Sequence, residues 1–135
     1  LYCNVEWSTT YLQSFFDNGA DSSCNMIFNY RNGLKAYLKS SLLEDLPTEA
    51  IFYCEKGTIK INKQFHCPST ITITVDGKEE NIDFNYKTIG YNYEVEHFNE
   101  LLRQEKTESP LMSFKFSKEL IALLDEVRIL INLKY

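Results

Sequence analysis

The alternation of hydrophobic and polar residues along the first two thirds of the chain predicts short β-strands joined by turns. In Thr70–Val75 two isoleucines and a valine alternate with threonines, so the apolar side chains share one face. Asp76-Gly77 and Asn32-Gly33 each stand between two such stretches, and pairs of this kind favour hairpin turns whose central residues have positive φ. The predicted strands cover residues 2–16, 24–30, 34–42, 49–54, 58–65 and 70–75, and a last strand carries Ile82, Phe84 and Tyr86.

After Gly90 the apolar residues recur at helical spacing and predict two helices. The first begins near Asn92 as N-cap and runs to about residue 105, and the second begins at Ser117 and ends with Asn132 in a left-handed cap. Their apolar stripes consist of Val95, Phe98, Leu101 and Leu102 in the first, and of Leu120, Leu123, Leu124, Val127 and Ile131 in the second. Strands followed by helices predict an α+β fold, an open, mainly antiparallel mixed sheet of about six strands with two C-terminal helices packed on one face.

Length and charge restrict the classes of function. At 135 residues the chain is expected to form a single domain over residues 1–135. A net charge of -5 provides no basic surface for phosphates, so nucleic acid and anionic membranes are not expected partners. No apolar stretch of membrane-spanning length and no signal peptide are readable, so the expected location is cytoplasmic.

The predicted strand at residues 50–54 is apolar on both sides, which is typical of a central strand. Two helices cover only one face of a six-stranded sheet, so the other face requires a different cover. We considered two covers, another protein surface or the N-terminal segment of this chain folded over the sheet.

No residue pattern for catalysis or for cofactor or metal binding is present. The five glycines stand singly, so there is no glycine-rich turn for a dinucleotide, and the four cysteines form no CxxC pair and are expected as free thiols, although a secreted protein would permit two disulfides. The adjacent His66 and Cys67 point to opposite faces of a strand and are interpreted as structural. His97 lies three residues after Glu94 on the first helix, an arrangement that suits a general base or pH switch but occurs more often as a packing contact.

Several short segments resemble, in order, the C-terminal domain of Gfo/Idh/MocA-type oxidoreductases of the dihydrodiol dehydrogenase-like branch. They are the Asn32-Gly33 hairpin, the PTEA segment at Pro47, GTIKI from Gly57, and Phe65 with Pro68, followed by GYNYEVEHFNELLR, the Glu108-Ser109-Pro110 loop and LLDEVR. The resemblance covers about residues 21–135. Relatives of this kind use NAD or NADP to oxidise or reduce sugars, inositols and dihydrodiols, and their cofactor loop and catalytic residues lie upstream of the part that is matched.

The resemblance implies the C-terminal substrate-side and oligomerisation domain of an NAD(P)-dependent dehydrogenase, with the N-terminal Rossmann domain absent and no activity alone. It also implies a homodimer through the open sheet face. Glu94, His97 and Glu108 are the candidate contacts to the upstream domain. The alternative from a different class is a free-standing, non-catalytic binding or dimerisation module, and a self-contained enzyme centred on Glu94 and His97 is a third interpretation.

Overall fold

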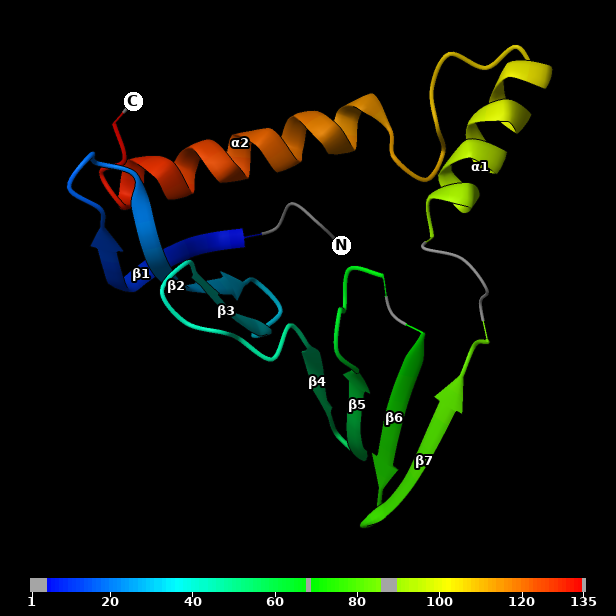
Figure 1. Cartoon of the computed structure of the whole chain (residues 1–135), viewed down its shortest axis with the longest axis horizontal. Coiled ribbons are helices and arrows are strands. Elements are labelled where there is room, and N and C mark those ends of the chain that lie inside the picture. Colours follow the sequence, from blue (N-terminus) through cyan, green and yellow to red (C-terminus); the bar gives the residue numbers. More distant parts are fainter. Residues whose placement is uncertain (1–4, 68, 86–89, 135) are drawn as a thin grey trace. The chain divides into compact units, whose positions relative to one another are not determined.

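The computed structural model describes residues 5–67, 69–85 and 90–134, with side chains from residue 13 onward, and it confirms an α+β fold with open antiparallel sheets (Figure 1). The elements are β1 (Val5–Phe15), β2 (Asp21–Tyr30), β3 (Lys35–Ser41), β4 (Ala50–Cys54), β5 (Gly57–Ile61), β6 (Thr70–Val75), β7 (Lys78–Asp83), α1 (Tyr91–Arg103) and α2 (Phe114–Leu130). The chain divides into two compact units, one formed by Leu1–Leu46 with Thr107–Tyr135 and the other by Pro47–Lys106. The single domain over residues 1–135 stays a prediction.

The first unit packs α2 on a three-stranded sheet in the order β1-β2-β3. Cys24 and Phe28 of β2 are buried against Val127 of α2 and Ile131 at its C-cap, because residues four apart on a strand share a face and residues four apart along a helix share a side. Partly buried apolar residues surround this core, namely Met26, Tyr30, Ala36, Leu123 and Leu133. The N-terminal strand β1 lies at one edge of this sheet.

The second unit contains a four-stranded sheet in the order β4-β5-β6-β7, in which each strand pairs with the next along the chain. The turn between β6 and β7 is the one expected from Asp76-Gly77, with φ of 51° and 75° at the two residues. The helix α1 also belongs to this unit, and none of its residues is buried in the described structure. Packing of α1 on the sheet stays a prediction, as does packing of both helices on one face.

The structure places the strands in two sheets where the sequence analysis expected one sheet of about six strands. Residues 42–49 separate β3 from β4. In this segment the Leu42 amide donates to the Ser22 carbonyl and the Leu43 amide to the Ser41 hydroxyl, while Pro47 has no amide to donate and Thr48 has a φ of 47°. The Leu42 bond is still in register with the β2–β3 pairing, whereas the conformations after it leave the strand ladder. The hydrophobic pattern of the flanking strands carries no information about these conformations.

The hairpin between β2 and β3 differs from the expected two-residue turn. The Tyr30 amide donates to the Leu34 carbonyl and the Gly33 amide to the Tyr30 carbonyl, so these two bonds close a three-residue loop of residues 31–33. Only Gly33 has positive φ, because the Asn32 side chain instead accepts a hydrogen bond from the Leu34 amide. The two strands and their antiparallel pairing are nevertheless as predicted.

The helix α1 begins at Tyr91, near Asn92 as predicted, although its cap residue differs, whereas the predicted start of α2 at Ser117 is wrong and its predicted end is right. Gly90 rather than Asn92 precedes α1, and Ser113 rather than Ser117 caps α2 by accepting a hydrogen bond from the Phe116 amide. Asn132 has the expected left-handed conformation, with a φ of 54°. Within the described part of the chain, neither helix has the length and hydropathy needed to cross a bilayer.

Candidate functional site

The most extensive candidate site is an apolar face of the four-stranded sheet in the second unit. Pairing of Ala50 with Ile61, Ile61 with Ile71 and Ile71 with Ile82 gives one row of aliphatic side chains across all four strands. A parallel row runs from Phe52 through Ile59 and Ile73. The apolar sheet face comprises Ala50, Phe52, Cys54, Ile59, Ile61, Ile71, Ile73, Val75 and Ile82.

None of these nine residues is buried within the part of the chain that the structure describes. Phe52 is 54% exposed and Val75 is 43% exposed. A contiguous apolar surface of this kind on a folded protein marks a contact with another surface. The face therefore has the composition of an interface.

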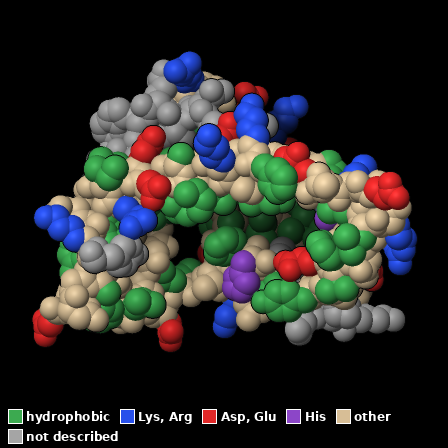
Figure 2. All heavy atoms as spheres, turned by 90° about the horizontal axis from the view of Figure 1, so that it is seen from above, with side chains coloured by type: hydrophobic (Ala, Val, Ile, Leu, Met, Phe, Trp, Pro, Cys, Tyr) green, Lys and Arg blue, Asp and Glu red, His purple; other side chains and the backbone are tan. Residues whose placement is uncertain are grey.

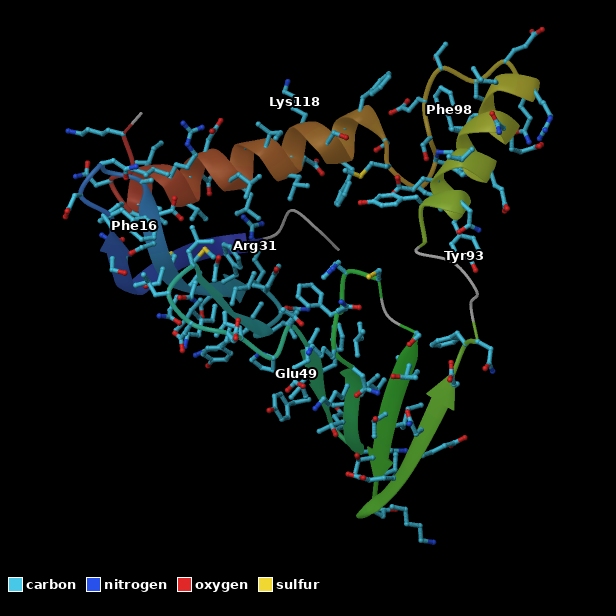
Figure 3. All side chains as sticks on the ribbon, in the orientation of Figure 1. Phe16, Arg31, Glu49, Tyr93, Phe98 and Lys118 are labelled. Carbon is cyan, nitrogen blue, oxygen red and sulfur yellow. The ribbon has the colours of Figure 1, made fainter. Side chains whose placement is uncertain are left out.

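The opposite face of the same sheet is mostly polar, apart from Ile51 and Tyr53 of β4. Lys60 forms an ion pair with Glu49, with 2.7 Å between Nζ and Oε2. The Asn62 side chain donates to the hydroxyls of Thr70 and Thr72 over 3.0 and 3.1 Å. Figure 3 labels Glu49 at the start of β4. The two faces thus differ in chemistry, and only one of them favours burial against a protein surface.

Hydrophobic side chains also reach the surface beyond this sheet, among charged groups (Figure 2). On α1 the exposed apolar residues include the predicted stripe members Val95, Phe98 and Leu102, of which Phe98 is labelled in Figure 3. On α2 the predicted core residues Val127 and Ile131 are buried, but Leu120 and Leu124 are exposed, which corrects the prediction for these two. Helical spacing places residues on one side of a helix without showing how far a neighbouring sheet extends along it.

The three candidate interdomain residues do not form one cluster in a single unit. Glu94 and His97 lie on α1, where Glu94 is an exposed acid in the first turn and His97 is half-buried. Glu108 belongs to the other unit, and its Oε1 accepts a hydrogen bond from the Phe114 amide over 2.5 Å. Glu94 at a helix N-terminus and Glu108 at a helix cap both have local structural roles, and their contact with another domain stays a prediction.

One carboxylate on α1 has a perturbed pKa. Glu100 accepts hydrogen bonds from the side chains of Gln104 over 2.6 Å and Arg103 over 3.3 Å. These bonds favour the charged form, so they lower the pKa of Glu100, with the Gln104 bond as the larger cause. The Glu100 side chain is 53% exposed, and the arrangement resembles an ordinary ion pair on a helix surface.

The sulfur and histidine side chains show no catalytic grouping. Cys24 and Cys54 are free thiols, as expected, whereas Cys3 and Tyr86 lie outside the described residues. Burial raises the pKa of the Cys24 thiol, and the nearby charge of Asp21 adds to this effect. Among the described residues no group of three or more histidine, cysteine, aspartate or glutamate side chains is placed to hold a metal ion.

The described residues do not fit a dinucleotide. All described strand pairs are antiparallel, whereas a dinucleotide fold requires a strand, a glycine-rich turn and a helix in a parallel unit. The N-terminal amides of α2 at Phe114 and Phe116 already donate to the side chains of Glu108 and Ser113. No catalytic step is therefore assigned to these residues.

Comparison with known proteins identifies relatives of one enzyme class. No protein-family model matches the chain. Trans-1,2-dihydrobenzene-1,2-diol dehydrogenase of Xenopus tropicalis is 31% identical over 118 residues, which are 82% of this chain and 35% of that protein. The enzyme of the same name from Oryctolagus cuniculus is 27% identical over 120 residues, which are 84% of this chain and 36% of that protein.

A solved structure, the aldose-aldose oxidoreductase from Caulobacter crescentus complexed with glycerol, shares the fold with a TM-score of 0.74 and 10% identity. The similarity covers 91% of this chain and 38% of that one. The chain thus spans about a third of the length of the curated relatives that it matches. These sequence matches confirm the resemblance of this chain to the dihydrodiol dehydrogenase-like branch of the Gfo/Idh/MocA-type oxidoreductases.

Proposed function

We propose that this chain is the C-terminal substrate-side and oligomerisation domain of a cytoplasmic NAD(P)-dependent oxidoreductase that acts on a sugar, polyol or dihydrodiol. The observation that carries the proposal is the match of 82% of the chain to 35% of a dihydrodiol dehydrogenase. An upstream Rossmann domain would hold NAD or NADP and supply the hydride-transfer chemistry. This chain would form one side of the substrate pocket and would be inactive alone.

The apolar sheet face supports the oligomerisation part of the proposal. A twofold axis would stack two copies of this face and remove apolar residues of both from water. Phe52, at 54% exposed, and the isoleucine rows beside it provide the hydrophobic centre that obligate homodimer interfaces have. The expected assembly is a homodimer.

The same face also suits the second candidate, a free-standing dimerisation or binding module without catalysis. The two candidates differ in the length of the native protein and in cofactor use. A blot of source-cell extract with an antibody raised to this chain measures the first. A band far above 15.8 kDa supports the domain proposal, and a band at 15.8 kDa overturns it in favour of the module.

The second measurement is oxidation activity of the native-length protein. It is assayed with NAD and with NADP, on a trans-dihydrodiol, an aldose and an inositol. Activity with any of these substrates supports the proposal. A native protein of greater length that binds neither cofactor would overturn the oxidoreductase assignment and leave the oligomerisation role to be tested alone.

A further inference from the structure

The side of the second unit's sheet that carries the apolar face also carries two charged residues of β7. In the register of β6 with β7, Glu80 pairs with Ile73 and Lys78 pairs with Val75. Residues paired across a ladder have their side chains on the same side of the sheet, so both charges lie at the β7 edge of the apolar face. Neither Lys78 nor Glu80 forms an ion pair within the part of the chain that the structure describes.

The two charged residues belong to neighbouring rows of paired residues that cross all four strands. The large row consists of Phe52, Ile59, Ile73 and Glu80, and the small row consists of Cys54, Gly57, Val75 and Lys78. The large row contains bulky side chains and ends in an acid, whereas the small row contains a glycine and a cysteine and ends in a base. The two rows are therefore complementary to each other in both volume and charge.

A twofold axis that runs across the strands would bring these rows together. Two stacked sheets lie about 10 Å apart with their strands roughly aligned, and such an axis places each strand over its own copy in the opposite direction. The line of residues between the two rows points to the other face and consists of Tyr53, Thr58, Thr74 and Glu79. An axis over this line packs each large row on the small row of the second copy, so that Glu80 faces the second copy's Lys78 on both sides of the axis.

Other twofold arrangements leave the two charges without a suitable partner. An axis over the large row brings Glu80 against its own copy, and an axis over the small row does the same to Lys78. An axis over the line on the other side of the large row sets Glu80 on Ile82. An axis parallel to the strands stacks β7 on β4, so that the charges meet Phe52 and Cys54. Like charges in contact, or charges buried without a partner, destabilise an interface.

We propose that a second copy of this chain covers the apolar sheet face in this one register, with reciprocal pairs of Glu80 and Lys78 across the twofold axis. An identical copy is favoured because a twofold interface must be complementary to itself, and these two rows are. The inference rests on the homodimer of the proposed function and adds which residues meet in it. The strand register of the second unit alone determines which side chains share each row.

The test is charge reversal in the native-length protein, followed by sedimentation velocity over a concentration series. Lys78→Glu and Glu80→Lys each place like charges at both pairs, so we expect either variant to raise the dimer dissociation constant at least about tenfold. The double variant exchanges the two charges and restores both pairs, so its dissociation constant should stay within about threefold of the original value. Circular dichroism verifies that each variant is folded.

The matched control is Glu79→Lys, which reverses a charge between the two residues but on the other face of the sheet. We expect it to change the dissociation constant by less than about threefold, since it lies outside the contact. An effect as large as that of Glu80→Lys would assign the loss to net charge and overturn the inference.

A mixture of the two single variants tests whether the pairs are reciprocal. A copy with Lys78→Glu carries only acids at the two positions and a copy with Glu80→Lys carries only bases, so both pairs are attractive in the mixed dimer. We expect the mixture to dimerise at concentrations at which neither variant does so alone.

The outcomes separate this inference from the proposed function. A dimer that tolerates both single reversals, or a double variant and a mixture that bind no more tightly than the single variants, would overturn the inference and leave the homodimer in place. An unaltered protein that stays monomeric at every concentration would reject the homodimer together with this inference. Oxidation activity, which is measured separately, decides the oxidoreductase part of the proposed function in either case.

Discussion

The carboxylate of Glu108 accepts a hydrogen bond from the backbone amide of Phe114, the first residue of α2. Ser113 accepts another from Phe116, so two side chains satisfy the orphan amides at this helix end. Glu108 was a candidate contact to another domain on sequence grounds. In the structure it fixes where the helix begins.

Removal of this cap should destabilise the first unit. We expect Glu108→Ala to lower the free energy of unfolding by about 1 kcal/mol, since it removes both an acceptor and a negative charge near the helix N-terminus. Thermal unfolding followed by circular dichroism measures the effect. Glu126→Ala, an exposed acid on the same helix, is the control, and equal losses in both variants would show that the cap contributes nothing of its own.

Neighbouring residues of β4 provide a matched test of the homodimer. Phe52 lies on the apolar sheet face and Tyr53, which is 81% exposed, lies on the polar face. We expect Phe52→Asp to raise the dimer dissociation constant at least about a hundredfold, as a charge placed in an apolar interface does, and Tyr53→Asp to leave it within about threefold. Sedimentation velocity over a concentration series measures both, with circular dichroism to verify folding. A dimer that survives Phe52→Asp would place the interface elsewhere.

Gly57 stands where β5 approaches the backbone of β6. A Cβ at this position would lie 1.9 Å from the Thr74 carbonyl oxygen, whereas a Cβ at Gly77 would meet no atom within 4 Å. We expect Gly57→Ala to cost about 3 kcal/mol because the two strands must separate, and Gly77→Ala to cost about 1 kcal/mol from backbone conformation alone. Urea unfolding gives both values. Similar costs for the two variants would mean that β5 and β6 adjust without loss.

The Gln104 bond to Glu100 predicts a change in titration. Because this bond lowers the pKa of Glu100, its favourable contribution to α1 is present above the ordinary glutamate pKa and is lost as pH falls through the lowered value. We expect Gln104→Ala to raise the pKa of Glu100 toward its ordinary range, measured by NMR of the side-chain carboxyl carbon. Asn99→Ala is the control on the same helix. An unchanged pKa in Gln104→Ala would assign the effect to Arg103.

Features of the fold that depend on adjacent residues were predicted correctly, whereas features that depend on residues farther apart were not. The turn at Asp76-Gly77 and the alternation in β6 were read correctly because both depend on adjacent residues. The start of α2 was not predicted correctly, because Ser113 and Ser117 are equally good caps by residue type. Only the hydrogen bond from the Phe114 amide to Glu108 distinguishes them. The division into two sheets depends on residues 42–49, whose conformation is set by local hydrogen bonds and by Pro47.

The candidate site was predicted in part. The alternation in β6 and the apolar character of β4 identified a sheet face available for contact, and the register of β4 to β7 defines its nine residues. The exposed apolar residues around the start of α2 were missed. Leu111 and Met112 precede the helix and follow no period, so no sequence pattern indicates their exposure.

The core of the first unit joins residues about a hundred positions apart, a separation at which loop closure carries a large entropic cost. On the ribosome, β2 emerges long before Val127 and Ile131, so Cys24 and Phe28 stay uncovered until α2 is made. The sheet of the second unit pairs only consecutive strands, so each strand can pair as soon as the next one is made. Contacts between residues close in sequence also form quickly. We therefore expect hydrogen exchange pulsed during refolding to protect β5 and β6 before β2, which makes the C-terminal helix the final step of folding.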